Sequence, residues 1–232
     1  MDERIARKLV ELNSGFYERL AGPFSATRLG FQPGYERLSA YVTLSARVLD
    51  VGCGNGRFAR FLAERVGPVD YTGVDFSEQL LQVAAGLPGC YVRRDLTQPG
   101  CLADLGEFQV IVCLSMLQHI PGRASRERLL REMGERLLPG GYILMCNWQF
   151  LDSPRQQRKV RPWAEAGIGS EQVEPGDYLL SWDRGGTGLR YVACIDYPAT
   201  VALCEPAGLR VIDSFRSDGR EGDLNLYTVL AG

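Results

Sequence analysis

The sequence has little of the residue types that would indicate a metal site, a disulfide scaffold or a membrane protein. Its 232 residues include one histidine, and the seven cysteines (53, 90, 101, 113, 146, 194 and 204) form no Cys-x-x-Cys pair. We therefore expect buried free thiols and no bound metal. No apolar run approaches the roughly 20 residues that span a bilayer, and the first residues alternate in charge instead of forming a signal-peptide core. These absences predict a cytoplasmic protein without membrane contact.

An excess of positive charge is also lacking. Lys and Arg number 26 against 28 Asp and Glu, which gives a net charge of −2. A chain with this balance has no global basic field of the kind that dominates non-specific nucleic-acid binding, so any RNA contact must be local. The hydrophobic fraction of 45% is ordinary for a globular protein, and the length suits one α/β domain.

Strand and helix patterns alternate from residue 47 onward. Strands are predicted near 47–51, 70–75, 89–93, 108–114 and 141–147. Helices are predicted near 56–66, 77–86 and 123–138. After a helix over 197–207, two more apolar runs at 209–212 and 224–230 predict a terminal pair of strands. This alternation is typical of a Rossmann-like, doubly wound α/β sheet, here of about seven strands.

The rest of the chain lacks this alternation. Residues 1–45 predict a helical cap punctuated at Gly22-Pro23, and Pro139-Gly140-Gly141 predicts a helix stop before a strand. Residues 148–192 are rich in Pro, Gly, Trp and charge, which predicts a structureless insertion that acts as a lid or binding loop. We expect one domain over 1–232, made of the cap (1–45), a cofactor-binding core (46–147), the substrate-side insertion (148–192) and a C-terminal helix with strands (193–232).

A glycine-rich turn follows the first predicted strand. Residues 50–56 are Asp-Val-Gly-Cys-Gly-Asn-Gly, and glycines let a ligand approach the main chain near the start of a helix. Dinucleotide-binding folds use Gly-x-Gly-x-x-Gly, whose last glycine would fall at Arg57. A second acid, Asp75, ends the next predicted strand 19 residues after Gly56, where a carboxylate is expected to hold both hydroxyls of a ribose.

This loop resembles the first motif of class I methyltransferases, and the resemblance implies S-adenosylmethionine as cofactor in place of NAD. An acid at the strand end helps to hold the loop in that family, and the glycines admit the methionine part of the cofactor. Asp95 is alternatively a helix cap or turn acid. The cofactor-binding residues expected in this core are Asp50, Gly52, Cys53, Gly54, Gly56, Asp75, Phe76, Asp95, Leu96, Leu114 and Ser115.

The only histidine, His119, follows the fourth predicted strand. An imidazole at this end of the sheet can position or deprotonate a methyl acceptor, or it can be a satisfied structural residue. Both interpretations stay open. The arginines of the following helix are assigned to its exposed face, with Glu127, Glu132 and Glu135 as partners; they are Arg123, Arg126, Arg128, Arg131 and Arg136.

Several stretches resemble one narrower family, the wobble-uridine tRNA carboxymethyl methyltransferases. They are Phe16-Tyr17, Phe24-Ser25-Ala26-Thr27-Arg28, Gln118-His119, Asp177 to Trp182 and Arg190-Tyr191. The resemblance implies methyl-ester formation on the carboxymethyl group of uridine 34 and a small zinc-binding activator protein as partner. It places Phe16, Tyr17 and Arg28 at the cofactor, and Arg28 and His119 at the chemistry. Arg28 would hold the carboxylate of the acceptor or of the cofactor, or form a structural salt bridge.

A local basic and aromatic cluster lies in the insertion. Arg155, Arg158, Lys159 and Arg161 stand near Trp163 and Trp182, as phosphate contact and base stacking in tRNA would require, although a solvated charged loop has the same composition. Two alternatives to the tRNA enzyme remain. One is a small-molecule O- or N-methyltransferase, and the other is a catalytically silent cofactor-binding partner of another protein.

Overall fold

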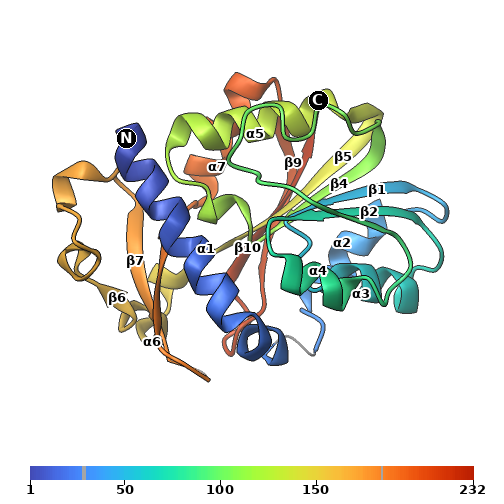
Figure 1. The fold of residues 1–232 in the computed structure, drawn as a ribbon. Helices are drawn as coiled ribbons and strands as arrows, with labels where there is room; N and C mark the ends of the chain where they lie inside the picture. The colour runs from blue at the N-terminus through green and yellow to red at the C-terminus, as the bar shows by residue number, and fades with distance from the viewer. Residues whose placement is uncertain (28–29, 184) are drawn as a thin grey trace.

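A seven-stranded sheet forms the centre of the molecule (Figure 1). The structure is a computed structural model that describes residues 1–27, 30–183 and 185–232. The strand order is β3-β2-β1-β4-β5-β10-β9. The strands are β1 (Arg47–Val51), β2 (Asp70–Asp75), β3 (Cys90–Arg93), β4 (Phe108–Leu114), β5 (Leu137–Trp148), β9 (Arg210–Ser217) and β10 (Asn225–Ala231). The first five pair in parallel, and β10 is antiparallel to both β5 and β9. The expected doubly wound sheet with its terminal strand pair is confirmed.

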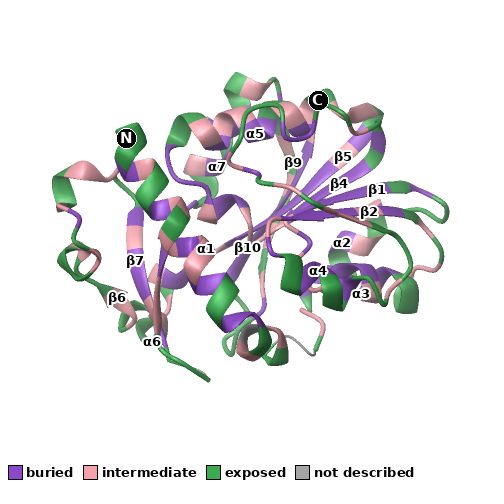
Figure 2. Cartoon of the chain, in the orientation of Figure 1, coloured by how far each residue is buried: buried purple, intermediate pink, exposed green. Residues whose placement is uncertain are grey.

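Helices cover both faces of this sheet and make two hydrophobic cores. The helices α2 (Gly34–Leu38) and α3 (Arg57–Arg65) pack on one face, and α5 (Arg123–Glu135) and α7 (Tyr197–Cys204) pack on the other. Neighbouring residues of β1 serve opposite cores, because Val48 packs toward α3 and Leu49 toward α5. The central strands are therefore buried on both sides (Figure 2), which explains their continuous apolar sequence.

The N-terminal cap differs from the expectation. Residues Glu3–Ala26 form one helix, α1, and Pro23 lies inside it. The expected interruption at Gly22-Pro23 is wrong: Pro23 cannot donate an i→i−4 hydrogen bond, but the helix continues past it to Ala26. In Figure 1, α1 lies between the central sheet and the strands of the insertion. It therefore contributes side chains to both.

The insertion is not structureless, and that expectation is wrong as well. It forms a second, antiparallel sheet from β6 (Val160–Arg161), β7 (Asp177–Trp182) and β8 (Gly188–Ala193). The 3₁₀ turn η3 (Phe150–Asp152) and the short helix α6 (Pro154–Gln157) connect β5 to β6, and the 3₁₀ turns η4 (Trp163–Ala166) and η5 (Ser170–Gln172) lie between β6 and β7. Its residues pack on α1 and on the carboxyl end of β5, so the second sheet forms a wall beside the main one.

Two smaller expectations need correction. The helix before β5 ends at Glu135, so Pro139-Gly140-Gly141 is no helix stop; it lies inside β5 as an irregularity, where the register jumps from Phe108↔Leu137 to Val110↔Tyr142. Arg126 is not on the exposed face of α5, because it is 7% exposed and points toward the insertion. The remaining helix is α4 (Glu78–Ala84), and the remaining turns are η1 (Ser39–Tyr41), η2 (Leu117–His119) and η6 (Glu205–Ala207).

The structure adds two facts about chemical environment. All seven cysteines are free, and five of them are buried. Among the described residues, no helix is long and apolar enough to cross a membrane.

Candidate functional site

The glycine loop between β1 and α3 is fixed by hydrogen bonds to β2. The N–H groups of Gly52 and Cys53 both donate to the carbonyl of Val74, at 2.8 and 3.0 Å. Gly54 has φ +55°, and a Cβ built on it would meet no atom within 4 Å. The glycine is thus required by its backbone conformation, and open space lies beside its main chain.

Asp75 completes this loop from the end of β2. Its Oδ2 accepts from the N–H of Gly54 at 2.9 Å, and its Oδ1 accepts from the N–H of Ser77 at the same distance. The side chain is 7% exposed, and burial raises its pKa. Each carboxylate oxygen has a second lone pair, so Asp75 can still accept two hydroxyl groups.

Asp50 was expected to hold the loop, but its carboxylate is bound elsewhere. Its Oδ2 accepts from the hydroxyl of Tyr71 at 2.6 Å, and the residue is 2% exposed. Burial raises the pKa of Asp50 to about 7, although the Tyr71 hydrogen bond opposes that shift. Asp75, not Asp50, is therefore the acid that accepts a hydrogen bond from a glycine of the loop.

Asp95 follows β3 and organises its own turn. It accepts from the N–H of Thr97 at 2.9 Å, from the Thr97 hydroxyl and from the side-chain amide of Gln98. Partial burial raises the pKa of Asp95, but these hydrogen bonds outweigh the burial and leave the pKa lowered. The turn-acid interpretation therefore holds, while Asp95 and the buried Leu96 also line the cavity described next.

One cavity of about 590 Å³ lies at the carboxyl ends of the strands. Its cofactor half is lined by residues at the ends of β1, β2, β3 and β4: Asp50, Gly52, Cys53, Gly54, Asp75, Phe76, Asp95, Leu96, Leu114 and Ser115. Its other half is lined by α1, η2, the end of β5 and the insertion: Asn13, Tyr17, Gln118, His119, Trp148, Arg155, Lys159, Trp182 and Arg190. In parallel α/β sheets this edge is where ligands bind.

His119 stands in the second half with both ring nitrogens engaged. Its Nδ1 lies 3.1 Å from the carbonyl oxygen of Tyr191, and its Nε2 lies 3.2 Å from the hydroxyl of Tyr17. A carbonyl only accepts, so Nδ1 carries the proton and Nε2 of the neutral ring accepts from Tyr17. The ring of Phe76 packs edge-on against Tyr17, with centroids 5.9 Å apart. The sequence predicts the position of His119 after the fourth strand, but it does not predict the contact of His119 with Tyr191.

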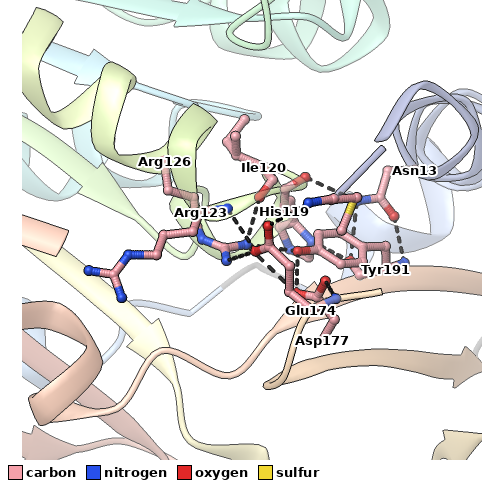
Figure 3. A network of polar contacts seen from close by, with 9 residues as sticks. Asn13, His119, Ile120, Arg123, Arg126, Glu174, Asp177 and Tyr191 are labelled. Carbon is pink, nitrogen blue, oxygen red and sulfur yellow. Dashed lines mark hydrogen bonds and ion pairs between the residues drawn. The ribbon is translucent and has the colours of Figure 1, made fainter. Parts of the chain in front are cut away.

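A buried polar network holds this histidine from behind (Figure 3). The side chain of Asn13 donates to the carbonyl of Tyr191 at 3.2 Å and accepts from its N–H at 2.8 Å. The Tyr191 hydroxyl donates to Asp177 at 2.7 Å and accepts from Arg126 at 2.8 Å. Arg126 also pairs with Glu174 at 3.1 Å. The network therefore joins α1, α5 and the strand β7 to Tyr191 on β8, whose carbonyl orients His119.

The basic and aromatic cluster of the insertion is divided by the fold. Arg155 and Lys159 line the cavity, whereas Arg161 forms an ion pair with Glu165 at 2.7 Å on the surface. Trp163 packs against the core beside Tyr191, and Trp182 is 7% exposed against Phe16. Trp163 thus belongs to the packing of the core, whereas Trp182 packs on Phe16 and also lines the cavity.

The remaining predicted site residues have different positions. Phe16 is fully buried and supports Tyr17 and Trp182 from behind the cavity wall. Gly56 caps α3 with φ +73° and does not line the cavity. Arg28 lies outside the described residues.

Sequence reasoning missed three cavity residues. The position of Trp148 in the cavity could have been predicted, because it lies at the end of β5 and the carboxyl ends of parallel strands face the ligand. The family resemblance included Arg190-Tyr191 but gave Arg190 no role, and no pattern marks Asn13; their positions depend on α1 and on a second sheet that the composition did not predict.

Comparison with known proteins agrees with this architecture. A family model described as a methyltransferase domain matches residues 25–180. A protein of Encephalitozoon cuniculi, provisionally named as a methyltransferase, is 32% identical over 200 residues, which cover 85% of this chain and 87% of that protein. The ubiquinone biosynthesis O-methyltransferase of Idiomarina loihiensis is 33% identical over 146 residues, or 61% of this chain and 52% of that enzyme. The match thus spans about half the length of this second relative.

Solved structures share the fold at low identity. A methyltransferase from Methanosarcina mazei, described as S-adenosylmethionine-dependent, has a TM-score of 0.66 and 16% identity, with 87% of this chain and 98% of that chain covered. The glycopeptide N-methyltransferase MtfA, in complex with S-adenosylmethionine, has a TM-score of 0.59 and 17% identity over 85% and 86% of the two chains. The chain belongs to the methyltransferase domain family, and its fold is that of S-adenosylmethionine-dependent methyltransferases.

Proposed function

We propose that this methyltransferase transfers a methyl group from S-adenosylmethionine to a hydroxyl oxygen of a small molecule. The observation that carries the proposal is the single cavity that joins Asp75 and the glycine loop to His119 and Trp148. Its volume of about 590 Å³ falls within the roughly 300–1,000 Å³ that small-molecule sites occupy. The similarity to O-methyltransferases of ubiquinone biosynthesis supports the same class of acceptor.

The cofactor half of the cavity fits S-adenosylmethionine, which supplies an electrophilic methyl group. Asp75 keeps acceptor capacity for two ribose hydroxyls, and its bonds to Gly54 and Ser77 hold the carboxylate in place. The open space beside Gly54 lets a ligand contact the main chain near the start of α3. Phe76 and Leu96 supply apolar walls for the adenine.

In the acceptor half, Tyr17 and His119 form a proton-accepting pair. A hydroxyl oxygen that attacks a methyl group must lose its proton during the reaction. Tyr17 donates to His119 Nε2, so Tyr17 can pass its own proton to the imidazole while it takes the proton of the acceptor. The carbonyl of Tyr191 fixes the opposite nitrogen and so keeps Nε2 as the acceptor. The walls around the pair exclude water and hold the reacting oxygen in line, which contributes up to about 7–11 kcal/mol to catalysis.

Methyl-ester formation on carboxymethyluridine 34 of tRNA is the second candidate, and it stays a prediction. Arg155 and Lys159 favour it, because they place positive charge at the cavity wall. The packing of Trp163 and Trp182 against neighbouring side chains and the ion pair of Arg161 weaken it. A zinc-binding activator that docks on a sheet edge also stays a prediction, as does a silent cofactor-binding role.

One labelling experiment separates these functions. The purified protein is incubated with S-adenosylmethionine that carries a deuterated methyl group, together with a cell extract divided into small molecules and tRNA. We expect the label in a small molecule as a methyl ether, detected by mass spectrometry, and much less label with Asp75→Asn at a subsaturating cofactor concentration. Label in tRNA nucleosides instead would favour the second candidate, and absence of transfer to either fraction would favour the silent role.

A further inference from the structure

We propose that Arg190 binds a carboxylate of the methyl acceptor, at a position distinct from the hydroxyl that receives the methyl group. This inference rests on the proposed function, because it assigns the second recognition point of the same acceptor. It would make Arg190 the residue that selects anionic acceptors over neutral ones. The argument begins with the surroundings of its guanidinium group.

Arg190 is a buried cation without a counter-charge. It is 4% exposed, lines the cavity, and takes part in no ion pair with a described residue. Its Nε is enclosed and has no hydrogen-bond partner. No described carboxylate that lines the same cavity, such as Glu18 or Glu221, forms an ion pair with it. Burying an unpaired charge is unfavourable, so an arginine in this position indicates a ligand that supplies the missing negative charge.

Three aromatic rings hold the guanidinium without neutralising it. Its carbon lies 5.5 Å from the ring centre of Phe16, 5.2 Å from that of Trp148 and 5.4 Å from that of Trp182. Cation–π contacts stabilise the positive charge but use the ring faces, so the N–H donors stay available. Trp148 adds a second buried donor, because its Nε1 also has no partner. Two unsatisfied donors at one wall call for a ligand rich in acceptors, and a guanidinium matches the two oxygens of a carboxylate.

The fold places this arginine in the acceptor half. Arg190 and Tyr191 are neighbours on β8, so their side chains point to opposite sides of the strand. Tyr191 points toward Arg126 and Asp177, whereas Arg190 points toward Trp148 at the end of β5. In the main sheet, β4 and β1 separate β5 from β2, which carries Asp75. We therefore assign the carboxylate to the acceptor and not to the amino-acid part of the cofactor.

The test uses two matched probes, 4-fluorobenzoate and its neutral isostere 4-fluorobenzamide, with binding measured by ¹⁹F NMR in the presence and absence of S-adenosylhomocysteine. We expect the wild-type protein to bind the benzoate at least about tenfold more tightly, the gain of one charge-assisted pair. Arg190→Met should abolish the preference, and Arg190→Lys should keep part of it. Arg161→Met, which removes a cation of the same insertion that is paired with Glu165 on the surface, should leave it intact. Equal binding of the two probes by the wild type, or a preference that survives in Arg190→Met, would overturn the proposal.

Two further arms separate the alternatives. S-adenosylhomocysteine and 5′-methylthioadenosine differ by the amino-acid part of the cofactor. If Arg190→Met weakens the first and spares the second, Arg190 holds the cofactor, and our assignment is wrong. Should the wild type bind neither nucleoside but still prefer the benzoate, the proposed function fails while the carboxylate site stands. If Arg190→Met loses its native circular dichroism, Arg190→Lys provides the comparison.

Discussion

Asp50 and Asp75 end neighbouring parallel strands, but their environments give them different roles. Asp75 bonds two backbone N–H groups and faces the cavity with acceptor capacity left over. Asp50 has one hydrogen bond, from Tyr71, and is more deeply buried. The sequence predicts an acid at each position, because both follow apolar strands. It does not predict which acid holds the loop, since that depends on the partner brought by another strand.

Asp50 makes stability depend on pH. Burial raises the pKa of Asp50 from its ordinary 3.8 to about 7 in the folded state, so between these values the native protein keeps a proton that the unfolded chain releases. The contribution of Asp50 to stability is therefore complete below pH 4 and is lost as pH rises through 7. Asp50→Asn mimics the neutral acid. Relative to the wild type, its free energy of unfolding should gain about 2–3 kcal/mol between pH 5 and pH 8, measured by urea titration. A difference that does not change with pH would contradict the assignment.

The pair formed by Tyr17 and His119 should control the chemical step and not cofactor binding. For a hydroxyl acceptor, His119→Asn should lower kcat by about 10²–10⁴ and change the pH profile of kcat, because the proton acceptor is lost. Tyr17→Phe should lower kcat in the same direction, because it breaks the contact with Nε2. Single-turnover rates with the acceptor found by labelling measure this. An unchanged pH profile in His119→Asn would favour an acceptor that is already ionised, as in methyl-ester formation.

Among the elements, α1 and α5 are fastened to the insertion by polar side chains and not by apolar packing alone. Asn13 of α1 binds both backbone groups of Tyr191 on β8, and Arg126 of α5 binds the side chains of Tyr191 and Glu174. The wall of the acceptor half is therefore coupled to the orientation of His119. A shift of β8 would move the carbonyl that fixes the imidazole.

Removing Arg126 should weaken the polar contacts between α5 and the insertion and so destabilise the protein. Arg126→Met leaves the buried carboxylate of Asp177 without its cation, which lies 3.8 Å away. We expect a loss of about 3–5 kcal/mol in the free energy of unfolding, measured by urea titration. Arg131→Met, on the exposed face of the same helix, should change it by less than about 0.5 kcal/mol. A triple variant that also carries Glu174→Gln and Asp177→Asn should recover most of the loss, and equal losses in the two single variants would contradict the role of the ion pair.

The elements that the sequence predicts well are those with a local cause. The strands from 47 to 147 are buried on both faces and so have continuous apolar runs, and Asp75 follows one of them directly. The strands of the insertion could not be predicted in this way, because β6 spans only two residues and the second sheet is stabilised by contacts with α1 and β5. Asn13 meets Tyr191 across 178 residues of sequence, so no spacing rule reveals the contact.

At the scale of the whole molecule, the second sheet converts a shallow strand-end site into a cavity with two halves. The cofactor half is built from local motifs of the main sheet, and the acceptor half is built from α1, η2 and the insertion. This division explains why the sequence predicts the cofactor more readily than it predicts the methyl acceptor. The residues proposed to contact the acceptor, Arg190, Trp148 and His119, come together only in the folded chain.

Calorimetric titration with S-adenosylhomocysteine tests the central claim most directly, because the whole account depends on a cofactor held by Asp75 at the glycine loop. We predict binding by the wild type, no detectable binding of NAD, and an affinity about ten- to a hundredfold weaker in Asp75→Asn, since the ribose loses a charge-assisted acceptor worth about 1.5–3 kcal/mol. Asp70→Asn, at the exposed opposite end of β2, should bind as the wild type does. Unchanged affinity in Asp75→Asn, or preferential binding of NAD, would contradict the account.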